Sequence, residues 1–156
     1  MVKKHLIALF LNTGTKDAPK WTRIKKSTEL TISMNPSTEE YDYIADESST
    51  TELDKYAPAI DQDLTMYKGQ PDYEFAFERF FNMSTGADAH VGCMVVFMQE
   101  GSAADGFKAW QTDAVMSIND LNAVDSKINF ALAFGGTVDK GVATMTDGAP
   151  SFAIAA

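Results

Sequence analysis

Apolar and polar residues alternate along several segments of this 156-residue chain, and this period constrains its fold more than any other feature. The alternation is clearest in residues 127–134, and it recurs in residues 28–34 and 107–119. In residues 127–134 the apolar positions are Ile128, Phe130, Leu132 and Phe134. Successive side chains of a β-strand point to opposite faces, so a period of two predicts strands with one buried face.

Shorter apolar runs bounded by Gly, Pro, Asn and Asp predict further strands. Residues 91–98 are apolar at nearly every position, which is typical of a central strand that is buried on both faces. The other expected strands span residues 6–11, 21–24, 40–45, 59–68, 137–145 and 151–155.

Residues 72–84 change to the period of an α-helix. One helical face carries Tyr73, Ala76, Phe77, Phe80 and Ser84. Pro71 and Asp72 stand where a helix begins, and Gly86 stands where one ends. We interpret the aromatic stripe as core packing. The sequence therefore predicts a mainly β fold, a β-sandwich or small barrel with one packed α-helix, in a single domain of residues 1–156.

Residues 40–68 are interpreted as a long extended hairpin. The expected strands at 40–45 and 59–68 flank a polar, acidic stretch, and residues 46–56 form the expected tip. A connection of this length on a small domain is either mobile or engaged in a contact.

The formal net charge of −9 is distributed unevenly. Residues 1–26 hold seven basic side chains and one acidic one, whereas residues 27–78 hold thirteen acidic and two basic ones. A subunit that assembles with copies of itself could dock such a basic region on a neighbour's acidic one. The two regions could equally meet within one subunit or face solvent. The candidate basic docking patch consists of Lys3, Lys4, Lys20, Arg23, Lys25 and Lys26.

The sequence lacks the motifs of the common catalytic and cofactor sites. It contains no phosphate-binding Gly-rich loop and no G-x-S-x-G nucleophile motif. One cysteine, Cys93, and two histidines, His5 and His90, are too few and too scattered for a zinc site. We therefore expect no enzymatic activity, no catalytic residues, no cofactor and no metal. We interpret Cys93 as a small buried apolar residue.

Three groups of charged residues have an alternative functional interpretation. Glu74 and Glu78 lie four residues apart on the expected helix, where an exposed helical face is favoured over a hydrolase pair. The acids within residues 39–47 lack the spacing of an EF-hand, so a solvated face is favoured over a calcium site. The basic N-terminal region lacks the interleaved aromatic residues of a nucleic-acid binder. No segment approaches the ~18 apolar residues of a membrane span.

The order of elements between residues 29 and 86 is distinctive. An Asn-Pro stop follows the strand at 28–34, an acidic DYIAD segment spans 42–46, and a long return spans 50–60. The stretch YKGQPDYEF at 67–75 then leads into the aromatic helix. The series continues through residues 95–98, 107–120 and 128–145. This series covers nearly the whole chain and resembles the tail tube, or major tail, proteins of tailed bacteriophages and of phage-tail-like bacteriocins.

The resemblance implies a structural subunit that forms hexameric rings. The rings stack into a hollow tube, and their inner sheets join into one β-barrel around a lumen. DNA passes through this lumen without specific binding, or the tube supports a pore. The resemblance also implies contacts with tape-measure and tail-terminator proteins, a place in the virion tail after assembly in the host bacterial cytoplasm, and no membrane insertion of the subunit.

In this family the long hairpin reaches between subunits and onto the next ring. The resemblance therefore makes the hairpin residues candidates for contacts between subunits and between rings. These candidates are Asp46, Glu47, Thr50, Thr51, Glu52, Leu53 and Tyr56.

A monomeric β-sandwich module that binds a ligand such as a carbohydrate is the alternative. Trp21, Trp110 and the tyrosines would then serve as stacking platforms. Trp110 falls on the apolar face of its expected strand, which favours a place in the core. The two readings differ in assembly, because a binding module stays monomeric.

Overall fold

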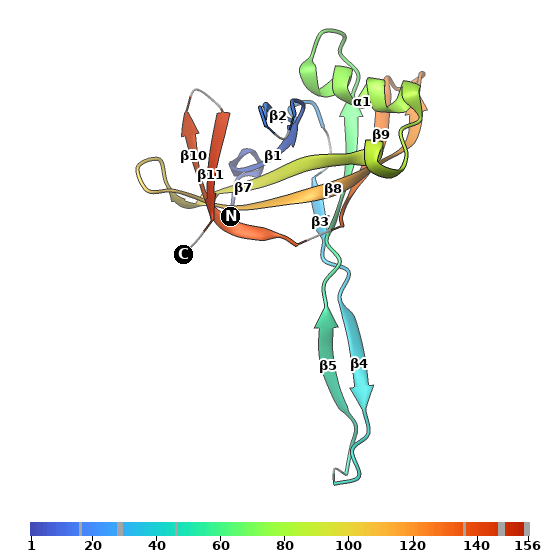
Figure 1. Ribbon diagram of the computed structural model, residues 1–156, viewed down its shortest axis with the longest axis vertical. Coiled ribbons are helices and arrows are strands. Elements are labelled where there is room, and N and C mark those ends of the chain that lie inside the picture. The colour runs from blue at the N-terminus through green and yellow to red at the C-terminus, as the bar shows by residue number, and fades with distance from the viewer. Residues whose placement is uncertain (16, 28–29, 46, 136, 147–148, 155–156) are drawn as a thin grey trace.

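The computed structural model describes residues 1–15, 17–27, 30–45, 47–135, 137–146 and 149–154. These residues form an antiparallel β body, one α-helix that covers part of it, and a long hairpin that projects from it (Figure 1). The expected class is thus confirmed: a mainly β fold with one packed helix and an extended hairpin. No helix in the described ranges has the length and apolar character needed to cross a membrane.

Nine strands of the described chain form one continuous sheet. Its main path runs β2-β1-β7-β8-β9-β6-β3, while β10 pairs with the first part of β8 and with β11. The strands are β1 (Ile7–Asn12), β2 (Trp21–Arg23), β3 (Thr31–Ser33), β6 (Ala59–Thr65), β7 (His90–Ser102), β8 (Gly106–Asn122), β9 (Lys127–Phe134), β10 (Asp139–Thr146) and β11 (Ala149–Ile154). Short 3-10 turns precede β1 at Lys4–Leu6 and β7 at Gly86–Ala89.

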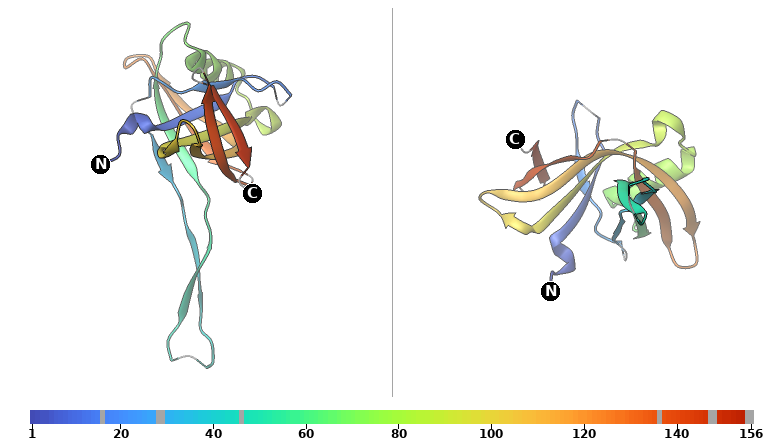
Figure 2. Two further views of the ribbon diagram at one scale, coloured as in Figure 1. Left: turned by 90° about the vertical axis from the view of Figure 1, so that its left-hand side faces the viewer. Right: turned by 90° about the horizontal axis from the view of Figure 1, so that it is seen from below.

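Two apolar clusters lie on opposite faces of this sheet. Along β1, Leu9 and Leu11 belong to the larger cluster, whereas Ala8 and Phe10 belong to the smaller one, which β10 and β11 complete. The larger cluster also contains Ile60 of β6, although three strands separate β6 from β1 in the sheet. The strands between them contribute to the same cluster, and Figure 2 shows that the sheet is strongly curved.

The helix α1 (Pro71–Asn82) is present, but its buried face differs from the expected one. Asp72 and Ala76 are buried, whereas Phe80 and Phe81 are 38% and 72% exposed. Residues of a helix are spaced by about 100° around its axis, and the inner face is turned by about one such step. Only part of the aromatic stripe, chiefly Tyr73 with Phe75 beside it, packs against the core.

Two polar residues explain this rotation because each finds a hydrogen-bond partner on the inner side of α1. An Asp72 oxygen, Oδ2, accepts a hydrogen bond from the backbone N–H of Lys25 at 3.2 Å. Arg79 donates from Nη2 to the carbonyl oxygen of His90 at 3.3 Å, and its guanidinium lies 4.9 Å from the ring centroid of Phe75. Buried polar groups are nearly always paired, and the buried Asp72 finds its partner with α1 in this orientation.

The hairpin consists of β4 (Ser37–Tyr41) and β5 (Thr50–Lys55), which pair only with each other. The expected arms were wrong: the strand expected at 40–45 lies at β4, and the segment expected to return at 59–68 is instead β6 of the body. In β6 every second residue, from Ile60 to Leu64, is buried, so this strand joins the core. Residues 50–55 have no such apolar alternation and form the returning arm of the hairpin, outside the body.

Candidate assembly surfaces

The hairpin has almost no buried surface of its own. Every residue of β4 and β5 is exposed except for the half-buried Ser37 and Thr50. Its register is regular from the Tyr41–Thr50 pair to the Thr38–Leu53 pair, with a bulge next to Ser37. An isolated two-stranded hairpin is marginally stable in water at best. A projecting hairpin with no core is therefore suited to a partner that covers it.

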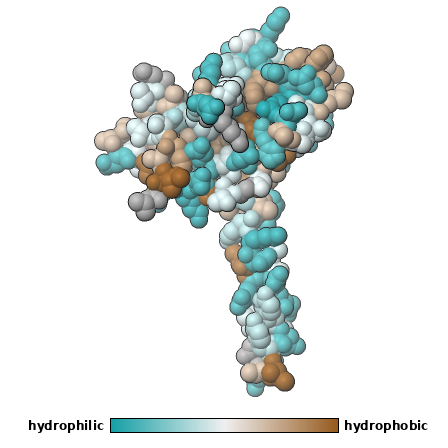
Figure 3. Space-filling view, viewed as in Figure 1, coloured by the Kyte–Doolittle hydropathy of each residue, from teal (hydrophilic) through white to brown (hydrophobic). Residues whose placement is uncertain are grey.

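Apolar and aromatic side chains lie on this otherwise acidic hairpin. Tyr41 and Tyr43 stack with their ring centroids 5.6 Å apart, and Ile44, the next residue, is fully exposed. On the returning arm and just beyond it, Leu53 and Tyr56 are about half exposed. Figure 3 shows an apolar patch at the free end of the hairpin, surrounded by hydrophilic surface.

The acidic character of the hairpin is visible at Tyr41. The pKa of Tyr41 is raised, first because its hydroxyl donates a hydrogen bond to Glu39, then because of desolvation and the nearby charges of Glu52 and Asp54. Carboxylates of both arms thus create one negative field along the hairpin.

Most of the residues predicted to lie at the tip of the hairpin lie in its returning arm instead. The residues between β4 and β5 are 42–49, so Glu47 lies at the tip, while Asp46 lies outside the described residues. The other predicted positions lie in or just after the returning arm, and these are Thr50, Thr51, Glu52, Leu53 and Tyr56. The prediction missed Ile44, whose signal was an isolated apolar residue within an acidic turn.

Three of the six predicted basic residues gather at one hollow of about 770 Å³. Lys4, Arg23 and Lys25 line this hollow together with apolar residues of β1 and of the segments beside it. Arg23 donates from Nη2 to the carbonyl oxygen of His5 at 2.9 Å, which fastens the N-terminal turn beside β2. The structure therefore brings half of the predicted patch together around a concave surface.

The other three basic residues do not line this hollow. Lys20 precedes β2 at the end of β1 that carries Asn12, and its backbone N–H donates to the Asn12 side chain at 3.0 Å. The Nζ atom of Lys26 lies 5.3 Å from the ring centroid of Tyr67. Lys3 is exposed next to the N-terminal turn. The six residues thus do not form one patch.

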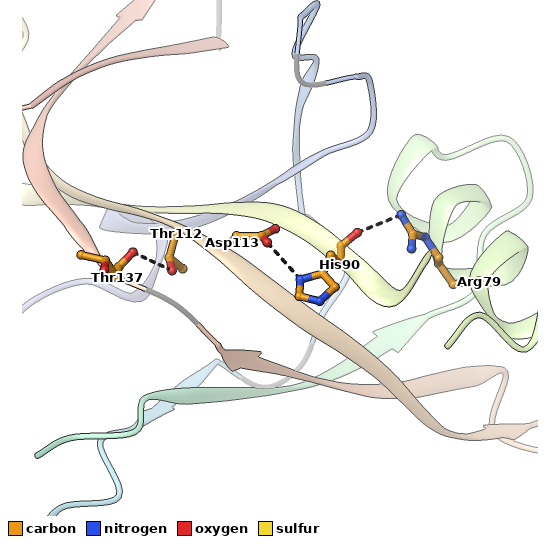
Figure 4. Close-up of polar contacts among 5 residues, drawn as sticks. All are labelled: Arg79, His90, Thr112, Asp113 and Thr137. Carbon is orange, nitrogen blue, oxygen red and sulfur yellow. Dashed lines mark hydrogen bonds and ion pairs between the residues drawn. The ribbon is translucent and has the colours of Figure 1, made fainter. Parts of the chain in front are cut away.

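A polar cluster on β7 and β8 connects the sheet to α1 (Figure 4). The Nδ1 atom of His90 lies 2.9 Å from Oδ2 of Asp113, and Thr112 donates from Oγ1 to the carbonyl oxygen of Thr137 at 3.3 Å. An exposed pair such as His90–Asp113 contributes at most about 1 kcal/mol to stability. These contacts join neighbouring elements of the fold.

The side chains that could in principle take part in catalysis, Cys93, Glu74 and Glu78, lie outside this polar cluster. Burial raises the pKa of the Cys93 thiol to about 12, so this residue is not a thiolate nucleophile. An oxygen of Glu74, Oε1, accepts a hydrogen bond from the backbone N–H of Gly69, and Glu78 lines a hollow beside Phe81. Within the ranges that the structure describes, no group of three or more His, Cys, Asp and Glu side chains could hold a metal ion.

Comparisons with known proteins identify the fold. No protein family and no curated protein match the sequence. A chain in the tail of an empty gene transfer agent (GTA) particle with C6 symmetry aligns with a TM-score of 0.61 and 13% identity, covering 88% of this chain and 97% of the other. A chain of the native GTA virion aligns with a TM-score of 0.61 and 14% identity, covering 90% and 98%. The chain therefore shares the fold of these two GTA chains.

Proposed function

We propose that the protein is a structural, non-enzymatic subunit that assembles into stacked hexameric rings forming a hollow tail tube. The observation that carries this proposal is the projecting hairpin, whose arms are exposed along nearly their whole length. The similarity of the fold to a chain of a GTA tail and to a chain of a GTA virion supports it, and the C6 symmetry of that tail supports six subunits in a ring.

Open sheet edges give a physical reason for ring formation. Along the described chain, β2, β3 and β11 each pair with a strand on one side only. Such edges present unpaired backbone groups, and natural proteins cover or pair them. Pairing between neighbouring subunits would remove edges and would join their sheets into one barrel around a lumen.

The proposed tube sets the partners and the location. The tube would extend from ring to ring, because a hairpin that contacts a different surface of a subunit in the next ring makes a head-to-tail contact, and such contacts form an open filament when the rotation between subunits does not close a ring. Tape-measure and tail-terminator proteins would bind inside it and at its end. DNA would pass without specific binding, since an acidic protein repels phosphate. The subunit, a single domain of residues 1–156, would assemble in the host bacterial cytoplasm and end in the virion tail.

The monomeric binding module gains no support from the tryptophans. Trp110 packs edge-on against Phe97 with ring centroids 5.2 Å apart, next to the larger core cluster. Trp21 packs against the smaller cluster. A carbohydrate-stacking platform needs a flat exposed ring, whereas Trp110 packs against the core.

Removal of the hairpin tests the proposal. Ser37 and Lys55 face each other at its base, so residues 38–54 can be replaced by a two-residue Asn-Gly turn. The shortened protein is expected to fold and remain monomeric at concentrations at which the full chain forms tubes. Electron microscopy and sedimentation velocity measure both. Normal tubes from the shortened protein would overturn the role of the hairpin.

A further inference from the structure

The tip of the hairpin carries an apolar side chain that is not buried in its own subunit. Ile44 is fully exposed, and it follows the stacked pair of Tyr41 and Tyr43. A fully extended chain from Ser37 to Ile44 spans at most roughly 20–25 Å, and the hairpin points away from the body in Figure 1 and in the left view of Figure 2. The tip therefore reaches a surface of another molecule and not of its own.

The hollow that holds Lys4, Arg23 and Lys25 combines a basic rim with an apolar wall. Ile7 of β1, Ile24 after β2 and the partly exposed Leu30 before β3 provide the apolar side chains. No carboxylate belongs to the described residues that line it. Such a surface matches an apolar side chain that is carried on an acidic segment.

The charge of its lining residues distinguishes this hollow from two others on the described surface. The hollow beside α1 is lined by Glu74 and Glu78, and the one beside β8 and β10 is lined by Asp113 and Asp139. Residues 37–56 hold seven acidic side chains and one basic side chain, Lys55. Like charges placed together oppose binding, so the hairpin is repelled from the two acidic hollows and attracted to the basic one.

We infer that this basic hollow receives the hairpin tip of a second copy of the chain, with Ile44 as the apolar anchor and Leu30 on the wall that it contacts. This inference rests on the proposed tube function and names the two surfaces that meet. Tip and hollow are different surfaces of one subunit, so each molecule can give one contact and receive another. The contact therefore propagates along an assembly.

Cysteine cross-linking in assembled protein tests the contact. The variant carrying Ile44→Cys and Leu30→Cys is treated with a short bismaleimide, while the native Cys93 is buried and does not interfere. The expected product is a ladder of covalent oligomers on a denaturing gel. The matched control carries Ile44→Cys and Phe81→Cys, which places the second thiol at the acidic hollow beside α1, and it is expected to give no ladder.

The outcomes separate this inference from the proposed function. Tubes that give a ladder with position 30 support both. Tubes that give no ladder with position 30, or that cross-link to position 81 instead, overturn the assigned contact and leave the tube function standing. If the unsubstituted protein forms no tubes at all, the proposed function itself fails.

A single substitution gives a second measurement. Ile44→Asp removes the apolar anchor at a residue that contacts no core, so the fold of the monomer is expected to be unchanged. The lost burial is expected to raise the protein concentration required for assembly about tenfold or more. An unchanged assembly concentration would overturn the anchor role of Ile44.

Discussion

Asn35 donates a hydrogen bond from its side-chain Nδ2 to the carbonyl oxygen of Ala57, 3.0 Å away, and so ties together the two chain segments at the base of the hairpin. The backbone N–H of Ala57 in turn donates to the carbonyl oxygen of Met34 at 2.9 Å. Asn35 has a φ of 46°, a conformation that asparagine tolerates better than most residues. The Asn-Pro pair thus fixes the point at which the chain leaves the body.

Replacement of Asn35 is expected to weaken assembly more than folding. Asn35→Gly keeps the positive φ accessible and removes the side chain with its amide, so its effect reports the lost hydrogen bonds together with a more flexible backbone. We expect a melting temperature close to that of the unsubstituted protein and an assembly concentration raised several-fold, because a looser hairpin loses more entropy on docking. Differential scanning calorimetry and light scattering measure the two quantities. Unchanged assembly of Asn35→Gly would refute a role in assembly for the hydrogen bond from Asn35 to Ala57.

Charge reversal at the basic hollow is expected to act through the hairpin. Lys25→Glu should raise the assembly concentration about 2- to 5-fold, and adding Glu47→Lys should recover part of the loss. Lys3→Glu is the matched control, because Lys3 does not line the hollow. Light scattering at increasing salt checks the cause, since ~1 M salt shortens the Debye length to about 3 Å. Equal effects of Lys25→Glu and Lys3→Glu would exclude a specific contact.

The thiol of Cys93 is expected to be inert in the folded protein. Burial raises its pKa to about 12, so at pH 8 the reactive thiolate is almost absent and reagent cannot reach the sulfur. A colorimetric thiol reagent should therefore react only as fast as the protein unfolds, and at once in denaturant. Rapid labelling of the native protein would show that β7 is more open than the structure has it.

The inner face of α1 can be tested by stability. Asp72 is 4% exposed and accepts hydrogen bonds from the backbone N–H groups of Lys25 and Tyr73, so Asp72→Ala should lower the free energy of unfolding by about 1–3 kcal/mol. Phe81→Ser alters an exposed side chain and should cost less than about 0.5 kcal/mol. Urea unfolding measures both. A larger loss for Phe81→Ser would mean that the aromatic stripe, and not Asp72, faces the core.

The strands of the body could be predicted because their period is uninterrupted. In β9 the four residues from Ile128 to Phe134 that were expected to face inward are all buried, and β7 is the central strand that its apolar run predicted. The resemblance of the ordered elements to tail tube proteins is confirmed at the level of fold. These features depend on local pattern, which the sequence carries directly.

The remaining features depend on residues far apart in the chain. The rotation of α1 follows from the bonds of Asp72 to Lys25 and of Arg79 to His90, and no period within residues 72–84 contains this information. The arms of the hairpin were misplaced because β5 has the length of a strand but not its apolar alternation. The basic hollow forms only when three parts of the chain come together: β1, β6 and the segment that follows β2.

Electron microscopy of the purified full-length protein over a range of concentrations tests the central claim most directly. The account predicts hollow tubes built from stacked rings, with sixfold symmetry in end-on averages and a lumen that remains open. A protein that stays monomeric at every concentration, or that forms filaments without a lumen, would contradict it.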